Sequence, residues 1–104
     1  MTDDLLLAML LDRLGQEFDI QKVVLFGSRA GLDFSPESDW DVLVVTNSDL
    51  PFLQRQKLAM HKMGRRDFAL DLLVFTSAEL QEGCELKGSA LYWANQEGRM
   101  LFAR

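Results

Sequence analysis

The sequence predicts a single domain of the α/β or α+β class, with a mixed β-sheet of about three to five strands and helices packed mainly on one face. Short apolar runs rich in β-branched and aromatic residues predict the strands, and longer leucine- and methionine-rich segments between them predict the helices. At 104 residues the chain is long enough for one domain, residues 1–104, and too short for two. Its 48% hydrophobic and 26% charged residues are typical of a globular domain with a core.

The first half of the chain predicts helices and strands in alternation. A threonine cap and two aspartates in the first turn, which favour the positive end of a helix dipole, begin a helix over residues 2–18. Residues 22–26, Lys-Val-Val-Leu-Phe, predict a buried strand that stops at a Gly-Ser turn, and a short helix is expected after Ser28. The polar, proline-containing residues 33–38 predict a loop, and a second strand follows over residues 39–46.

The second half continues the alternation and closes on an edge strand. A proline at the start and a glycine after the end bound a helix over residues 51–63, and residues 68–75 predict a third strand. A threonine followed three residues later by a glutamate forms a capping box, which begins a helical segment over residues 76–83. A further helix over residues 89–96 and an edge strand over residues 100–103 complete the order α-β-α-β-α-β-α-α-β.

Two aspartates at the start of the second strand are the first chemical signal. Asp39 and Asp41 are separated by one residue, so strand alternation places both on one face, about 7 Å apart along the backbone, while Trp40, Val42 and Val44 face the other way. Carboxylates in this position repel each other and lose hydration unless a positive group lies between them. Oxygen ligands with no histidine or cysteine nearby favour Mg²⁺ or Mn²⁺ as that group.

A third aspartate and a glycine turn extend this pattern. Asp71 interrupts the apolar strand predicted over residues 68–75, and it joins the other two aspartates if that strand pairs beside the second. Gly27 and Ser28 end the first strand and offer backbone N–H groups and a hydroxyl to a phosphate, where Arg29 adds positive charge. Carboxylates that hold two metal ions opposite an anion-binding turn suit an in-line displacement at phosphorus.

These motifs carry a resemblance to a known family. The Gly-Ser-Arg-Ala motif at residues 27–30, the Ser-Asp-Trp-Asp motif at residues 38–41 and the later Asp71 resemble the minimal nucleotidyltransferase (MNT) branch of the DNA polymerase beta-like superfamily. The resemblance extends to residues 76–80 and 97–102, so it spans most of the chain. It implies the nucleotidyltransferase fold.

The resemblance also implies a role for each motif residue. Gly27 and Ser28 would position the triphosphate of the nucleotide. Asp39 and Asp41 would hold two Mg²⁺ ions, and Asp71 would complete one metal site. Asp71 would also help to deprotonate the attacking hydroxyl group.

Members of the family bind ATP or another nucleoside triphosphate and transfer the nucleoside monophosphate to a hydroxyl group. Short stand-alone members are commonly encoded with a helical HEPN-domain protein as an antitoxin and toxin pair. The resemblance therefore implies a Mg²⁺- and ATP-dependent enzyme with a protein acceptor and a HEPN-type partner, in a homo- or hetero-oligomer. This chain has Gly31-Leu32 where the family usually has Arg-Gly. The alternative is accordingly a non-catalytic antitoxin that neutralises its partner by forming a complex.

Charge and apolar length exclude other classes of function. A formal net charge of −5 and a pI near 4.7 disfavour bulk nucleic-acid binding, because they repel a phosphate backbone at long range. The longest apolar run, Leu5 to Leu11, is far shorter than the roughly 20 residues that span a bilayer, so no membrane association is expected. The acidic start of the chain lacks the features of a secretory signal, and the single Cys84 agrees with a reducing compartment. We therefore expect a cytoplasmic protein.

Three features also have a structural interpretation. Arg29 could be a solvated helix residue, and Asp71 could be an edge-strand residue that points into water. The basic run over residues 61–66 predicts a solvated turn, although it could also steer a nucleotide or an acidic partner.

Overall fold

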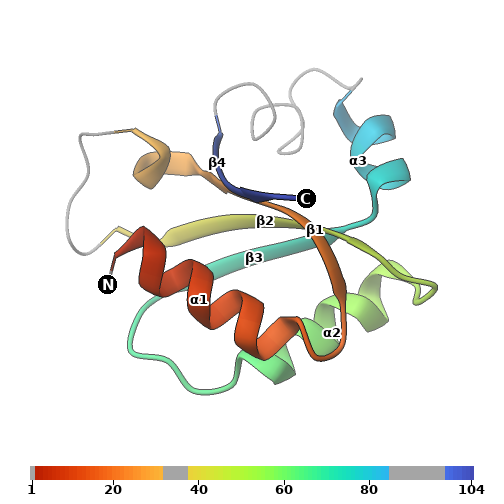
Figure 1. The fold of residues 1–104 in the computed structure, drawn as a ribbon, viewed down its shortest axis with the longest axis horizontal. Helices are drawn as coiled ribbons and strands as arrows, with labels where there is room; N and C mark the ends of the chain where they lie inside the picture. Colours follow the sequence, from red (N-terminus) through yellow and green to blue (C-terminus); the bar gives the residue numbers. More distant parts are fainter. Residues whose placement is uncertain (1, 32–37, 85–97) are drawn as a thin grey trace.

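The computed structural model describes residues 2–31, 38–84 and 98–104 (Figure 1). Along the chain its elements are α1 (Asp3–Leu14), β1 (Asp19–Phe26), the short 3₁₀ helix η1 (Gly27–Ala30), β2 (Trp40–Asn47), α2 (Phe52–Met63), β3 (Leu70–Phe75), α3 (Ser77–Cys84) and β4 (Arg99–Ala103). This order agrees with the alternation predicted from the sequence wherever the chain is described.

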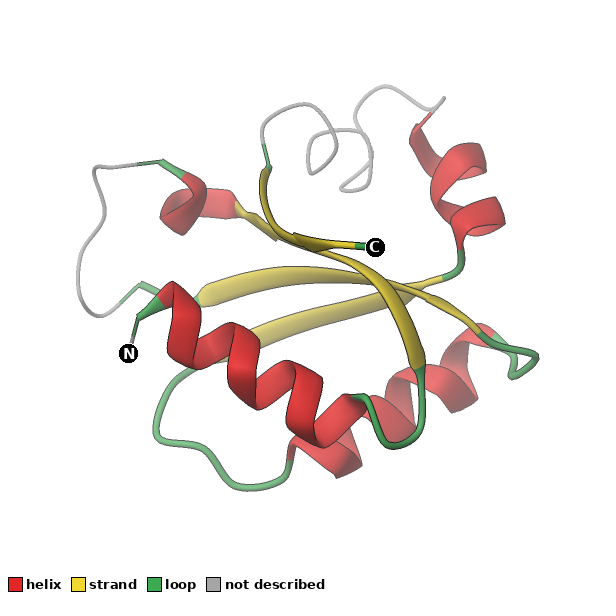
Figure 2. Cartoon of the chain, viewed as in Figure 1, coloured by secondary structure: helices red, strands yellow, loops and turns green. Residues whose placement is uncertain are grey.

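The strands form one mixed sheet in the order β3-β2-β1-β4 (Figure 2). β1 runs antiparallel to both β2 and β4, whereas β2 and β3 are parallel. Parallel neighbours need a crossover connection, and α2 provides it. The edge strand predicted over residues 100–103 is confirmed as β4. The fold is therefore α+β with an open mixed sheet, as predicted.

The main core lies between one face of the sheet and the helices α1 and α2 (Figure 1). Its buried side chains include Leu6, Leu10 and Leu14 of α1, Ala59 and Met63 of α2, and Trp40, Val42, Val44, Leu72 and Val74 of the strands. On the opposite face a smaller cluster forms, in which Leu43 and Val45 pack with Leu80 of α3. The prediction that helices cover mainly one face is confirmed.

The first helix and strand have different boundaries from those predicted. The helix expected over residues 2–18 ends at Leu14, and the strand expected over residues 22–26 begins at Asp19. The cause is the partner strand, because β1 pairs with β2 as far as Asp19 opposite Asn47. Hydrogen bonds to β2 therefore extend β1 over residues that the apolar pattern alone assigns to the helix or to the loop.

The parallel pair of strands begins later than predicted. β2 starts at Trp40 and β3 at Leu70, instead of spanning residues 39–46 and 68–75. These two starting residues are register partners, so the ladder begins where both strands are present. Asp39 consequently lies immediately before β2 rather than within it.

Side chains of α2 complete the outer edge of β3. Gln56 donates from Nε2 to the carbonyl oxygen of Leu72 at 2.9 Å, and its Oε1 accepts from the N–H of Val74 at 2.5 Å. Arg55, only 2% exposed, donates to the two carboxylate oxygens of Glu79 at 2.6 and 3.2 Å. These contacts join α2, β3 and α3, and they cover an edge that could otherwise pair with another chain.

The capping box predicted at the start of α3 is present. The N–H of Thr76 donates to Oε1 of Glu79 at 2.8 Å, and the N–H of Glu79 donates to Oγ1 of Thr76 at 3.3 Å. The helix predicted over residues 89–96 and most of the loop predicted over residues 33–38 lie outside the described residues. In the part of the chain that the structure describes, no helix is long and apolar enough to cross a membrane.

Candidate active site

The pairing of β2 with β3 brings the second and third aspartates together. Asp41 and Asp71 are direct register partners in the parallel ladder. Register partners on adjacent strands point to the same face, and the strands lie about 4.8 Å apart. Asp41 is half-buried and Asp71 is exposed, so this pair of carboxylates is open to solvent on one side. The strand pairing on which the predicted acidic site depends is therefore present.

Asp39, immediately before β2, lies near enough for its charge to act on Asp41. Burial raises the pKa of Asp41 above its ordinary value, and the negative charges of Asp71 and then of Asp39 raise it further. Trp40, Val42 and Val44 are buried in the main core, as the alternation predicts. Asp41 therefore lies on the face of the sheet opposite α1 and α2, together with the other residues that alternate with this core.

The end of β1 lies against Asp41. Phe26, the last residue of β1, is the register partner of Asp41, and the chain then turns into η1 through Gly27 with a φ of +70°. A Cβ atom on Gly27 would lie 2.1 Å from Oδ2 of Asp41 and 3.0 Å from its Cγ. Glycine is therefore required here both for the backbone conformation and for the approach to the carboxylate. Ser28 follows in η1, so the predicted phosphate turn and the aspartates lie at the same end of the sheet (Figure 1).

Arg29 is an internal residue rather than a solvated one. Its side chain is 6% exposed, and its guanidinium lies 4.0 Å from the centre of the Trp40 ring. Nε of Arg29 donates to the carbonyl oxygen of Ser38 at 2.9 Å. The carbonyl oxygen of Arg29 accepts from Nη2 of Arg99 at 3.2 Å. Arg29 therefore links η1, β4 and the residue that precedes Asp39.

This positioning contact of Arg29 was not predicted from the sequence. The functional interpretation assigned its charge to a phosphate, and the structural interpretation placed it in solvent. The one sequence feature that could have suggested this contact is the tryptophan next to Asp39, because a guanidinium group stacks well on an indole ring. Nothing in the sequence indicated that Arg29 and Trp40 come into contact.

The donor chemistry of the site fits a hard divalent cation. All three candidate ligands are carboxylates, and the pKa of Asp41 is raised first by burial and then by the charges of Asp71 and Asp39, a setting that a positive ion would relieve. Within residues 2–31, 38–84 and 98–104, no three acidic, histidine or cysteine side chains are already gathered around one metal position. The residues thus match Mg²⁺ in chemistry, while a complete protein cage for the ion is not formed.

Comparison with solved structures finds the same fold in toxin–antitoxin complexes. A crystal structure of a toxin–antitoxin with AMP-PNP matches with a TM-score of 0.65 and 21% identity, covering 100% of this chain and 75% of the other. A form of the toxin–antitoxin MntA-HpeT with two Asp-to-Glu substitutions matches with a TM-score of 0.61 and 19% identity, with coverage of 100% and 75%. At these identities the likeness establishes the fold.

A third structure gives a similar result. It comes from Sulfolobus solfataricus and carries a provisional nucleotidyltransferase assignment; its TM-score is 0.59 at 25% identity, covering 94% of this chain and 86% of the other. No curated protein matches the chain significantly. The family model described as "Polymerase beta, Nucleotidyltransferase" matches residues 10–97, which is most of the sequence. The chain belongs to the polymerase beta-type nucleotidyltransferase family, and its fold matches that of solved toxin–antitoxin structures.

Proposed function

We propose that this protein is a Mg²⁺-dependent nucleotidyltransferase, which moves AMP from ATP to a hydroxyl group of a partner protein. The observation that carries the proposal is the register pairing of Asp41 with Asp71, beside the turn at Gly27. Paired carboxylates next to backbone N–H groups suit the binding of a metal-bound polyphosphate. ATP and Mg²⁺ are both cytoplasmic, so the cytoplasm is the proposed location.

In this proposal the carboxylates of Asp39, Asp41 and Asp71 would hold the metal ions. We expect two Mg²⁺ ions, and Mn²⁺ is an alternative to Mg²⁺. Mg²⁺ usually takes one or two carboxylates and completes its shell with water and substrate phosphate oxygens. The site therefore needs no closed protein cage, and the nucleotide itself supplies the missing ligands. When bound, the ions neutralise charge on the phosphate oxygens during displacement at phosphorus.

The remaining residues bind the nucleotide and handle the proton. The backbone N–H groups of Gly27 and Ser28 orient the phosphates, and Arg29 adds positive charge beside this turn while it holds the start of β2. Asp71 is exposed and takes the proton of the acceptor hydroxyl. The acceptor oxygen forms a bond to the α-phosphorus, the bond between that phosphorus and the bridging oxygen breaks, and pyrophosphate leaves.

A partner protein is the proposed acceptor, and a HEPN-type toxin is the proposed partner. Similar folds occur in toxin–antitoxin structures. One of these structures contains AMP-PNP. In another, two aspartates that are separated by a single residue are changed to glutamate. That spacing is the spacing of Asp39 and Asp41 in this chain. The net charge of −5 further disfavours a nucleic acid as the acceptor.

A non-catalytic antitoxin is the second candidate. The observation that favours it is Gly31-Leu32 in place of the family's usual Arg-Gly, which removes a basic group near the phosphate turn. In that case the complex with the partner forms without ATP. A protein with asparagine at positions 39, 41 and 71 would then still neutralise the partner.

Transfer of labelled phosphate separates the two candidates. ATP labelled at the α-phosphate is incubated with Mg²⁺, a lysate of the source cells and either the native protein or Asp71→Asn. Asp49→Asn serves as the matched control, because Asp49 is an exposed aspartate beyond the opposite end of β2. We expect a labelled protein band with the native and Asp49→Asn proteins and none with Asp71→Asn. A band that persists with Asp71→Asn contradicts the proposed site, and no band with any of the three supports the non-catalytic candidate.

A further inference from the structure

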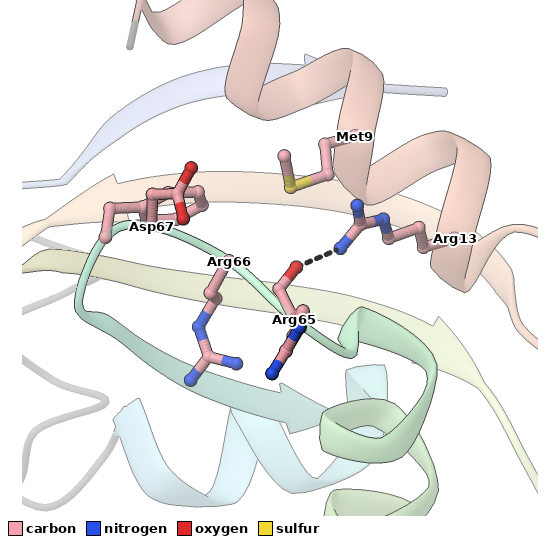
Figure 3. Close-up of a pocket in the computed structure, with 6 residues that line it drawn as sticks. Met9, Arg13, Arg65, Arg66 and Asp67 are labelled. Carbon is pink, nitrogen blue, oxygen red and sulfur yellow. Dashed lines mark hydrogen bonds between the residues drawn. The ribbon is translucent and has the colours of Figure 1, made fainter.

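A cavity of about 460 Å³ lies between α1 and the segment that joins α2 to β3 (Figure 3). Its lining residues are Met9, Arg13, Arg65, Arg66, Asp67 and Phe68. The volume falls within the roughly 300–1,000 Å³ that is usual for small-molecule sites. Met9 and Phe68 pack against the main core, which places the cavity on the helix-covered side of the sheet. Asp41 lies on the opposite face, so the cavity is separate from the candidate active site.

Within the described ranges, none of the three arginines of this cavity forms an ion pair with a carboxylate. Among the described residues the ion pairs are Arg55–Glu79, Lys62–Glu17, Arg99–Asp3 and Arg104–Asp19. Arg13, Arg65 and Arg66 belong to none of them, although the protein carries a net charge of −5 and Asp67 lines the same cavity. The lining therefore carries three arginines against one aspartate in a protein that is acidic as a whole, and this local excess of positive charge favours the binding of an anion.

The cavity is held in shape by hydrogen bonds to backbone groups. Nη1 of Arg13 donates across from α1 to the carbonyl oxygen of Arg65 at 3.1 Å (Figure 3). The same atom also donates to the carbonyl oxygen of Met63. Arg66 donates from Nη1 to the carbonyl oxygen of Gly64 at 3.2 Å. The segment after α2 is thereby tied to α1, while its residues Arg65 and Asp67 remain exposed to solvent.

One donor in the cavity lacks an acceptor. Nε of Arg66 is buried and has no hydrogen-bond partner in the described structure. A buried donor without a partner costs about 1–3 kcal/mol, and it is a reason to look for a missing acceptor. Phosphate oxygens are acceptors that arginine binds with particular preference, because its planar fork matches their geometry.

We propose that this cavity binds a small phosphate ester of about the size of a nucleoside monophosphate. The arginines bind the phosphate, Met9 and Phe68 supply an apolar wall for the body of the ligand, and Asp67 accepts hydrogen bonds from its hydroxyl or amino groups. The basic run over residues 61–66, which the sequence predicts to be a solvated turn, thus contributes part of a binding site. This inference goes beyond the transfer reaction, since none of these residues belongs to the candidate active site.

Methionine methyl signals test the proposal at the site itself. The full chain is labelled with ¹³C at the methionine methyl groups and titrated with AMP in the presence of EDTA. Met9 lines the cavity, whereas Met100 lies on the exposed strand β4 and serves as the internal reference. The signal of Met9 is assigned with Met9→Leu. We expect the Met9 signal to shift and saturate with AMP while the Met100 signal stays in place.

Charge variants and other ligands complete the test. The double variant Arg65→Gln/Arg66→Gln should weaken AMP binding by about tenfold or more, while Lys57→Gln, which removes an exposed charge from α2, should change it by less than about twofold. Arg13 is left intact because it supports the backbone. Adenosine should not shift Met9, and inorganic phosphate should bind about tenfold more weakly than AMP.

Several results would overturn the proposal. One is a Met9 signal that does not move up to about 10 mM AMP in a folded protein. Another is equal weakening by the double variant and by Lys57→Gln. Phosphate binding as tight as AMP binding would show that the cavity does not recognise the body of the ligand. None of these results depends on transfer activity, so they leave the proposed reaction untouched.

Discussion

A Cβ atom on Gly27 would lie 2.1 Å from Oδ2 of Asp41. The contact exists because Phe26, which precedes Gly27, is the register partner of Asp41. The turn proposed to bind phosphate and a carboxylate proposed to bind metal are therefore in direct contact. A side chain at position 27 would displace the carboxylate of Asp41, so the position of this carboxylate depends on glycine in the turn.

Replacing Gly27 by alanine should damage both stability and transfer. The backbone φ of +70° and the clash with Asp41 should together lower the free energy of unfolding by about 1–3 kcal/mol. Displacement of the carboxylate should lower the transfer rate by about 100-fold, because small shifts of catalytic groups have large effects. Thermal unfolding and the labelled-phosphate assay measure the two effects.

Gly64→Ala is the matched control for this variant. Gly64 also has a positive φ, +61°, but the nearest atom to an added Cβ is the carbonyl oxygen of His61 at 3.9 Å. The control should lose stability through backbone strain and keep its transfer rate when assayed below its unfolding temperature. If both variants lose activity equally, the contact between Gly27 and Asp41 is not what supports transfer.

Asp41→Asn should stabilise the protein at neutral pH while it abolishes transfer. Folding raises the pKa of Asp41 above 3.8, so the charged form is disfavoured in the native state. The contribution of this group to stability is fully present below pH 3.8 and is lost as the pH rises through the native pKa. Asparagine has no charge to lose, so its gain in Tm should be larger at pH 7 than at pH 4. An equal gain at both values would contradict the electrostatic explanation.

The chain offers a control for this prediction as well. Asp49 is exposed and lies beyond the other end of β2. Asp49→Asn removes the same charge from the protein without touching the acidic group. Its Tm should follow that of the native protein at both values of pH, which separates a local effect at Asp41 from the change in net charge.

Much of the fold follows from local sequence patterns. The capping box at Thr76 and Glu79 is a local signal, and both of its hydrogen bonds are present. The strand residues that alternate with Asp41 are buried as their spacing predicts. By contrast, the start of β1 at Asp19 depends on pairing with β2, which is distant in sequence. Local patterns therefore identify the elements, while partners in space determine where the elements begin.

The candidate site likewise has features that the sequence predicts and features that depend on contacts in three dimensions. The types and spacing of Asp39, Asp41 and Asp71 predict a metal-binding chemistry, because charged carboxylates in or beside apolar strands lose hydration. Whether Asp71 lies beside Asp41 depends on which strand neighbours β2, and the sequence could state this only as a condition. The burial of Arg29 against Trp40 depends on two segments meeting in three dimensions, and no local pattern encodes it.

Arg29→Lys should separate positioning from phosphate binding. Lysine keeps the charge but loses the planar stacking on Trp40 and the Nε hydrogen bond to the carbonyl oxygen of Ser38. If Arg29 acts by positioning the start of β2, kcat should fall by about tenfold or more while the KM for ATP changes little. Steady-state transfer kinetics measure both constants. A rise in KM with unchanged kcat would instead identify a direct contact with the nucleotide.

Glu79→Gln should destabilise the junction of α2, β3 and α3. The hydrogen bonds from Arg55 lower the pKa of Glu79 below 4.5, so its charged form stabilises the native state. That stability is present above pH 4.5 and is lost as the pH falls through the native pKa. At pH 7 the loss should be about 1–2 kcal/mol, because the glutamate is partly exposed and solvent weakens the interaction.

Denaturant unfolding of Glu79→Gln at pH 7 and at pH 4 measures this loss, and the difference from the native protein should narrow at the lower pH. Glu82→Gln is the control, since Glu82 is exposed on the same helix, and it should leave the free energy of unfolding unchanged. Arg55 is 2% exposed and would keep a buried charge without its carboxylate, which is why the loss should exceed that of a surface ion pair. A loss of the same size in both variants would mean that the charge of α3, rather than the contact with Arg55, stabilises this junction.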